Sequence, residues 1–531
     1  MQIRSFTPAW VSPRQIILSL LFIVTVSQSC SLVDSAIIPS PMAISNFLDY
    51  FHSTPNSNLS HAEIDVDTSK GGLGLKATSA LPAGFRIVSI PFTLLLSIEH
   101  VFSDDWAQQH LDPLSDTDAM AIYLAHIRKT GTSKWDPYIQ LLPSSFPSFP
   151  IFWSESQLNE LTGSSVKSFV ERRLRRAKET YDTLLDEDVK AELSMNDFLW
   201  GLSVLFSRSH SISVRSPSSG RWVKVACQVP MADLFNTATR TKIDEQDGNN
   251  VDCQTNDAST HFECFTTRPV TAGEELFVPY GGVGKAGMGN GQLLLDYGFV
   301  HEYNPFDLVA VNITPPQSVN MSGSNETDSN SSVVSDSDIF RLQSELLSAE
   351  LGGQYDPSSR SHSFFLPLPS SNTITLPPSE SFDSRLLTAG RIWHIDRSTI
   401  ESIQSIDEIK RRIQHKESIS ISHDLTVLRW ICGQLQANLR AFPTSLNEDQ
   451  QILSSLQLDD ETIESLDHDH ANHVQIQKAA LTLRMAEKKI ILLYYSILVE
   501  YEAELEDKLQ RGESPQLQQN KVKPPAHHDE L

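Results

Sequence analysis

The sequence is poor in cysteine and in positive charge. Its 531 residues include 5 cysteines, and 42 Lys and Arg stand against 66 Asp and Glu, which gives a formal net charge of −24. The CxC and CxxC spacings that hold structural zinc do not occur, so we expect no metal site. A nucleic-acid groove neutralises phosphates with Lys and Arg, so the charge excludes nucleic acid as a partner. It fits a basic or neutral protein partner, or solubility alone.

Long hydrophobic runs are also scarce. Arg4 and Arg14 precede one apolar run, residues 16–26, and small residues follow it. This layout is that of a secretory signal peptide, which we predict over residues 1–31. The run is short for a bilayer and no later segment is long and apolar enough, so we predict no membrane insertion.

The chain ends in the sequence HDEL, residues 528–531, which is the endoplasmic-reticulum retrieval signal. The tail before it, from residue 512, is rich in Pro, Gln and Lys, and we expect it to be mobile and accessible to the HDEL receptor. With the signal peptide, it predicts a soluble protein of the ER lumen. Glycosylation sequons agree with that location and occur at Asn58, Asn312, Asn320, Asn325 and Asn330.

Two of the cysteines, Cys253 and Cys264, flank a polar stretch. In an oxidising compartment they would close a short loop as a disulfide. Buried free thiols are an equally good interpretation of the sequence.

The length predicts two or three domains. Short apolar runs and turn signals indicate strands at about 60–100 and 221–300, with a helical period at about 105–205, where Ser115 stands at an N-cap position. A Ser/Asn-rich stretch at 304–340 predicts a linker, and helical spacing returns over 341–511. The fold class is therefore α+β: a β-rich part with a helical insert, followed by an all-α part.

The most informative stretch is 268–299, RPVTAGEELFVPYGGVGKAGMGNGQLLLDYGF. A turn leads into the apolar run 276–278, which we predict to be a strand that ends at Tyr280. A Gly-rich loop follows, and then a segment that ends in Tyr297 and Phe299. Glycines here allow backbone to approach closely.

Together with PMADLFN at 230–236 and KGGLGLKA at 70–77, this stretch resembles the SET-domain methyltransferases, in the branch of the Rubisco large-subunit lysine methyltransferase. The segments TSKWDPYIQLLPSSFPSFPIFW at 132–153 and DFLWGLSVLFSRSH at 197–210 resemble that branch as well. The resemblance implies a SET domain over 60–303, split by the helical insert, and a helical substrate-binding domain over 341–511. It also implies S-adenosylmethionine (SAM) as cofactor and a non-histone protein substrate methylated on lysine.

The resemblance also implies roles for single residues. Tyr280 would orient the amine beside the transferring methyl group, and Tyr297 would line the lysine channel. The expected cofactor contacts are Gly72, Leu73, Gly74, Arg208, Asp233, Asn236, Thr237 and Phe299, with Arg208 near the carboxylate and Asn236 near the adenosine. Asn290 would open the segment that returns to the pocket.

The sequence departs from the family pattern at one cofactor position. The family has an Asn-His pair where this chain has Asn236 and Thr237. This departure and the ER address favour an alternative, a protein-binding module of the ER that has lost activity. A second alternative, a protein-histidine methyltransferase, stays open because the resemblance includes proteins that methylate histidine and the sequence does not identify the acceptor.

Overall fold

The computed structural model describes residues 39–67, 72–215, 221–238, 248–281, 287–316, 335–352, 362–368, 384–456 and 468–513. The predicted signal peptide, the HDEL sequence and the sequons at Asn320, Asn325 and Asn330 lie outside these residues. These residues divide into two compact units, the described residues up to 308 with those of 442–487, and the described residues of 309–441 with those from 488 onward. We call them the first unit and the second unit.

Short antiparallel strands form the sheets of the first unit. One sheet has the order β1-β4-β9-β8, a second has β5-β7-β6, and β2 pairs with β3. The strands are β1 Asn58–Leu59, β2 Ala62–Asp67, β3 Gly72–Ala77, β4 Arg86–Pro91, β5 Leu96–Ser97, β6 Ser209–Arg215, β7 Trp222–Gln228, β8 Val251–Thr255 and β9 His261–Thr266. β3 carries glycine at alternate positions, and its Leu73 and Leu75 are buried. The strand therefore belongs to the core while its glycines leave room on the other face.

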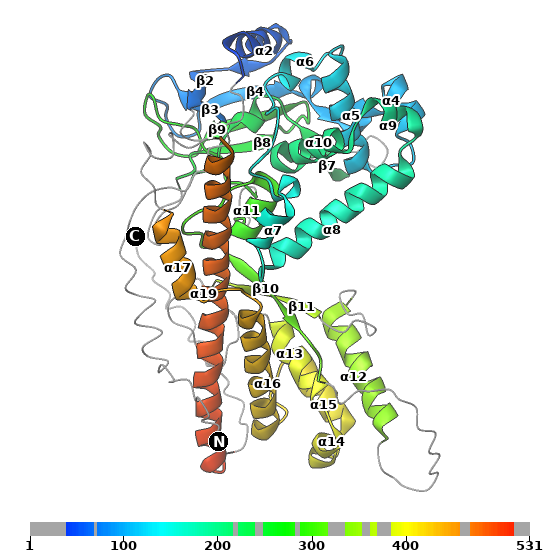
Figure 1. Cartoon of the computed structure of the whole chain (residues 1–531), viewed down its shortest axis with the longest axis vertical. Helices are drawn as coiled ribbons and strands as arrows, with labels where there is room; N and C mark the ends of the chain where they lie inside the picture. Colours follow the sequence, from blue (N-terminus) through cyan, green and yellow to red (C-terminus); the bar gives the residue numbers. More distant parts are fainter. Residues whose placement is uncertain are drawn as a thin grey trace, which may run out of the picture. The chain divides into compact units, whose positions relative to one another are not determined.

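Helices occupy the chain between β5 and β6, where the helical insert is predicted (Figure 1). They are α3 Ile98–Val101, α4 Asp105–His110, α5 Asp116–Thr130, α6 Asp136–Ile139, α7 Glu155–Asn159, α8 Ser165–Glu179, α9 Glu187–Glu192 and α10 Met195–Arg208. The Ser115 hydroxyl accepts from the Asp118 amide at 3.2 Å, which confirms the predicted N-cap of α5. α5 and α10 pack so closely that a Cβ on Gly201 would lie 2.1 Å from the Ala121 carbonyl oxygen. α10 ends at Arg208, so this packing fixes where that side chain begins.

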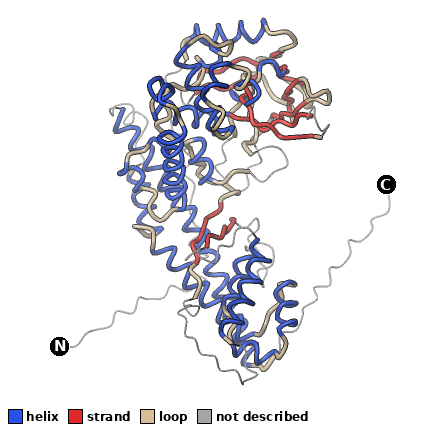
Figure 2. Tube along the Cα trace, turned by 90° about the vertical axis from the view of Figure 1, so that its right-hand side faces the viewer, coloured by secondary structure: helices blue, strands red, loops and turns tan. Residues whose placement is uncertain are grey.

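The second unit is largely helical (Figures 1 and 2). Its helices are α12 Asp336–Leu351, α13 Ser384–Trp393, α14 Arg397–Ile403, α15 Ile406–Gln414, α16 Ile421–Arg440 and the part of α19 His468–Gln510 that begins at Lys488. α13 packs against α12, α15 and α16. Inside this bundle the Arg391 guanidinium forms two hydrogen bonds with the Asp424 carboxylate, at 2.8 and 2.9 Å. The long final helix that the sequence predicts is present.

Three sequence predictions need correction. The predicted linker, 304–340, contains the strand β10, Leu308–Ile313, and the first residues of α12, where Ser335 forms a capping box with Asp338. The part predicted to be all-α, 341–511, contains the strand β11, His362–Pro367, which pairs with β10. The run 276–278 is not a strand of a ladder. The strands β10 and β11 form by pairing with each other across about fifty residues, which local composition does not reveal.

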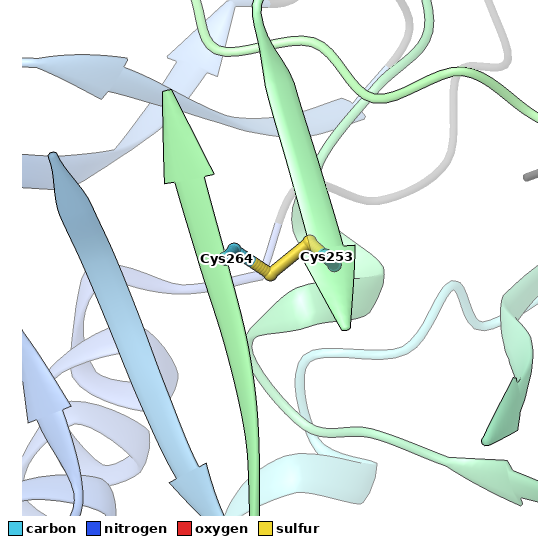
Figure 3. The surroundings of a disulfide bond; sticks show 2 residues. All are labelled: Cys253 and Cys264. Carbon is cyan, nitrogen blue, oxygen red and sulfur yellow. A yellow bond between two sulfur atoms is a disulfide. The ribbon is translucent and has the colours of Figure 1, made fainter. Parts of the chain in front are cut away.

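A disulfide joins Cys253 on β8 to Cys264 on β9, directly opposite each other in the strand register (Figure 3). β8 lies at the edge of its sheet, so the bond ties an edge strand to its only neighbour in that sheet. The other two described cysteines, Cys227 and Cys432, are buried thiols. Of the two interpretations of Cys253 and Cys264, the structure therefore shows the disulfide.

Among the described helices, none combines the length and the apolar character that crossing a bilayer requires.

Candidate functional site

Residues 275–278 lie in extended conformation between two parts of the chain that are distant in sequence. On one side the Leu276 amide donates to the Leu75 carbonyl of β3 at 2.7 Å, and on the other the Val278 amide donates to the Asn236 carbonyl at 2.9 Å. The contacts are isolated bridges, antiparallel to Lys76 and parallel to Asn236. The segment thus links β3 to the turn after β7, and it leads directly to Tyr280.

Tyr280, Tyr297 and Phe299 form one aromatic cluster. The two tyrosine rings stack with centroids 4.5 Å apart, and Phe299 lies 6.4 Å from Tyr280 and 6.2 Å from Tyr297. All three side chains are half-buried. Tyr297 ends α11, Asn290–Tyr297, and Gly298 at φ +77° stops that helix so that Phe299 can turn back.

Burial shifts the phenols of this cluster. Loss of solvation raises the pKa of Tyr280 to about 12, and the neighbouring Arg208 charge opposes that shift. Burial also raises the pKa of Tyr297, with a further contribution from Tyr280. Both hydroxyls therefore keep their protons at physiological pH and serve as neutral hydrogen-bonding groups. The Tyr280 hydroxyl makes a long hydrogen bond, 3.4 Å, to the Phe235 carbonyl oxygen.

Arg208 and Asp233 form an ion pair beside this cluster. Arg208 Nη1 donates to the Asp233 carbonyl oxygen at 3.1 Å and lies 3.3 Å from carboxylate Oδ2. The Asp233 side chain is 0% exposed and the Arg208 side chain 20% exposed. Asp233 lies in a short 3₁₀ turn, Ala232–Leu234, that follows Met231 at φ +82°. A buried non-glycine residue at positive φ is strained, which marks this turn as one held by its surroundings.

Asn236 connects the turn to the Gly-rich strand. Its Nδ2 donates to Glu275 Oε1 at 2.9 Å and to the Leu73 carbonyl oxygen at 3.3 Å. A Cβ on Gly74 would lie 2.9 Å from both Asn236 Nδ2 and Glu275 Oε1, so a larger residue at 74 would displace this hydrogen-bonded pair. The Asn236 side-chain amide thus bonds within the protein, and its predicted contact with the adenosine stays a prediction.

The predicted site residues differ in where the structure places them. It brings Tyr280, Tyr297 and Phe299 together, pairs Arg208 with Asp233, and joins Asn236 to Leu73 and Gly74. Phe235, the Tyr280 partner, lies in the same turn as Asp233 and Asn236, so these groups converge. Thr237 instead faces Asn249, whose Oδ1 lies 3.5 Å from the threonine hydroxyl. At Gly72, φ is +148° and a Cβ would meet no atom within 4 Å, so its place at the site rests on the backbone alone.

Asn290 is the first residue of α11, the segment that leads back to Tyr297, and its side chain holds that start in place. It is fully buried, its amide N donates to Asp307 Oδ1 at 2.6 Å, and its Oδ1 accepts from the His301 amide at 2.7 Å. These bonds fasten the start of α11 to the chain that follows Phe299. The residue therefore supports the aromatic cluster from behind.

Sequence reasoning missed two buried residues that support the site. The Tyr138 hydroxyl donates to Asp233 Oδ2 at 2.9 Å and lies 3.2 Å from Gln228 Oε1. The Asn250 side chain spans the 275–277 segment, donating to the Glu275 carbonyl at 2.8 Å and accepting from the Phe277 amide at 2.8 Å. Tyr138 lies in the segment 132–153, which carries the family resemblance but to which the sequence analysis assigns no function. No sequence signal distinguishes Asn250.

Comparison with known proteins identifies the fold. The chain superimposes on the crystal structure of the SET domain of LSMT bound to lysine and AdoHcy, with TM-score 0.62, 19% identity, and coverage of 88% of this chain and 94% of that one. A family model described as Rubisco LSMT substrate-binding matches residues 337–491. The chain therefore has the fold of the SET-domain protein LSMT, and residues 337–491 match the Rubisco LSMT substrate-binding family. Both the α+β fold and the resemblance inferred from the sequence are thereby confirmed.

Curated relatives of the chain include enzymes with two kinds of acceptor. It is 27% identical over 242 residues to the chloroplastic [fructose-bisphosphate aldolase]-lysine N-methyltransferase of Arabidopsis thaliana, covering 44% of this chain and 47% of the relative. It is 22% identical over 446 residues to the human actin-histidine N-methyltransferase, covering 80% and 64%. The chain thus spans about half the length of the first relative and under two thirds of the second.

Proposed function

We propose that the protein is a SAM-dependent protein methyltransferase whose acceptor is lysine. The observation that carries the proposal is the cluster of Tyr280, Tyr297 and Phe299 next to the Arg208–Asp233 pair. An aromatic wall beside a paired charge is what methyl transfer from a sulfonium to an amine requires.

The aromatic cluster suits the acceptor side of this reaction. A free lysine has a pKa of about 10.4, so the amine must lose its proton before it attacks. A narrow apolar channel disfavours the ammonium form, and aromatic walls do not compete for the proton. Tyr280 and Tyr297, both kept neutral by their raised pKa, offer hydroxyls that accept or donate one hydrogen bond and so orient the amine. Alignment of this kind supplies most of the rate enhancement in a displacement.

The residues of the site also fit the cofactor. Asp233 Oδ1 is buried and has no hydrogen-bond partner among the described residues, so it lacks a donor such as the ammonium of an amino acid. Arg208, at the other end of the ion pair, carries the charge that a carboxylate needs. Asn236 and the Gly74 backbone would hold the rest of the molecule where a side chain at 74 finds no space. When bound, SAM supplies the activated methyl group.

Histidine methylation is the second candidate, because the human actin-histidine N-methyltransferase aligns over 80% of this chain. The finer choice of lysine rests on the [fructose-bisphosphate aldolase]-lysine N-methyltransferase of Arabidopsis thaliana and on the LSMT structure that holds lysine. Loss of activity is the third candidate, and Thr237 is the residue that favours it.

We also propose that the protein resides in the ER lumen. The Cys253–Cys264 disulfide supports an oxidising compartment. The described sequons, at Asn58 and Asn312, are on exposed residues. Expression in eukaryotic cells followed by endoglycosidase treatment tests this: we expect a mass shift that Asn58→Gln with Asn312→Gln reduces. A protein of unmodified mass that fractionates with the cytosol would contradict it.

Methyl transfer from labelled SAM to proteins of an ER-lumen extract tests the function, with acid hydrolysis to identify the labelled amino acid. We expect labelled methyl-lysine with the wild type and much less of it with Tyr280→Phe. Labelled methylhistidine instead of methyl-lysine would show that the acceptor is histidine, which is the second candidate. Label equal in the wild type and in a reaction without the protein would contradict the enzyme.

A further inference from the structure

Behind the Arg208–Asp233 pair lies a buried tyrosine that comes from the helical insert. Tyr138 belongs to α6, is 0% exposed, and packs its ring 6.3 Å from that of Phe47. Its neighbour Trp135 donates from Nε1 to the Leu94 carbonyl at 3.1 Å, which fastens this part of the insert to the sheet side. The position of the Tyr138 ring is therefore fixed by packing that does not involve Asp233.

Two donors meet on the same carboxylate oxygen. The Tyr138 hydroxyl donates to Asp233 Oδ2 at 2.9 Å, and Arg208 Nη1 lies 3.3 Å from that oxygen. The other oxygen, Oδ1, is buried without a hydrogen-bond partner in the described residues. A buried polar atom left without a partner costs free energy, so the arrangement persists only because something fixes the carboxylate.

Tyr138 is the group suited to fix it. Arginine and carboxylate left to themselves favour a bidentate pair in which both oxygens are used. The tyrosine hydroxyl occupies Oδ2 from the insert side, and the Asp233 carbonyl also takes an Arg208 hydrogen bond, at 3.1 Å. The guanidinium therefore engages one carboxylate oxygen only.

We propose that Tyr138 is a positioning residue, which holds the Asp233 carboxylate so that Oδ1 and the Arg208 guanidinium stay available to the amino-acid end of the cofactor. This rests on the proposed function, and it assigns to the insert a part in cofactor recognition. Burial and the Asp233 charge raise the pKa of Tyr138, so its hydroxyl remains a donor throughout the physiological range.

The test compares ligands that share the adenosine and differ at the amino-acid end. Full-length wild type and Tyr138→Phe are titrated calorimetrically with S-adenosylhomocysteine and with 5′-methylthioadenosine, which lacks the amino-acid part. Tyr181→Phe is the matched control, because its hydroxyl also donates one hydrogen bond inside the insert, to the Leu193 carbonyl at 2.9 Å.

We expect Tyr138→Phe to weaken S-adenosylhomocysteine about tenfold, as a hydrogen bond to a charged group predicts, and to leave methylthioadenosine unchanged. Tyr181→Phe should change neither affinity. The ratio of the two affinities is unaffected by a fraction of unfolded variant, which lowers the number of sites for both ligands alike.

If Tyr138→Phe weakens the affinity for both ligands equally, or changes neither affinity, the proposed role of Tyr138 is wrong. Binding of S-adenosylhomocysteine by the wild type would still support the proposed function. A wild type that binds neither ligand overturns both.

Discussion

The rings of Tyr280 and Tyr297 stack at 4.5 Å with planes 25° apart, although an extended segment carries one and the end of a helix carries the other. Their contact depends on two separate devices: the Asn250 side chain that fixes residues 275–277, and the Asn290 network that fixes the start of α11. The candidate site is therefore assembled from elements that are each braced by a buried asparagine.

The substitution Tyr280→Phe removes only the hydroxyl, so it distinguishes a chemical role of Tyr280 from a role in packing. The one hydrogen bond of this hydroxyl, to the Phe235 carbonyl, is long at 3.4 Å, so Tyr280→Phe should keep the fold and the cofactor affinity nearly unchanged. We expect loss of most methyl transfer, measured as turnover at saturating SAM. Tyr181→Phe is the control and should retain activity. Wild-type turnover in Tyr280→Phe would show that the residue is misassigned.

Asn236→Ala should weaken SAM binding, because it removes the bonds to Glu275 and Leu73 that shape the turn. A hydrogen bond lost at a buried site is worth about 1 kcal/mol or more, roughly a fivefold rise in the dissociation constant. Asn256→Ala is the control, since Asn256 makes its bonds at the exposed turn between β8 and β9. Equal affinities in the two variants would contradict the assignment.

Thr237→His restores the residue of the family pattern and tests whether the departure matters. Thr237 has one long contact, 3.5 Å to Asn249, so the change disturbs little. We expect SAM affinity in calorimetry to stay the same or to tighten. A clear loss would mean that threonine belongs to a differently shaped pocket.

The disulfide should contribute measurably to stability, because it closes a short loop between an edge strand and its neighbour. Cys253→Ser with Cys264→Ser should lower the free energy of unfolding by about 3 kcal/mol, as loop closure predicts. Chemical denaturation of the double variant and of the wild type with reductant measures this. Identical midpoints with and without reductant in the wild type would show that the bond is absent.

Alkaline pH should destabilise the fold through its buried phenols. The pKa of Tyr280 rises to about 12, and burial also raises that of Tyr138. An unfolded tyrosine ionises near ~10, so between about pH 10 and 12 the unfolded state binds fewer protons and stability falls as pH rises. Below that window these groups change nothing. Thermal unfolding measured across it should show the fall, and a melting temperature that stays constant from pH 10 to 12 would contradict it.

The sequence predicts those parts of the molecule that local pattern controls. Ser115 precedes an apolar period and does cap α5, and the Tyr-Gly and Tyr-Gly-Phe motifs do meet as one cluster. The family resemblance accounts for the pairing of Arg208 with Asp233 only in part, since it places both at the cofactor without stating that they bind each other.

Long-range pairing explains what the sequence does not reveal. Tyr138 and Asp233 are 95 residues apart, and the hydroxyl that joins them belongs to a ring buried like any core tyrosine. Glu275 follows a turn and carries a charge, which is typical of a surface residue. In the structure it is buried, and Asn236, which is distant in the sequence, donates a hydrogen bond to it. β11 lies in a Ser/Pro-rich stretch and becomes a strand through its pairing with β10.

The most direct test of the central claim is calorimetric titration of SAM into the purified, folded wild-type protein. The arrangement of Arg208, Asp233 and the Gly74 backbone predicts saturable binding at one site, and Asn236→Ala should weaken it. A folded wild-type protein that shows no binding heat and no thermal stabilisation by SAM would contradict the account and leave a protein-binding module in its place.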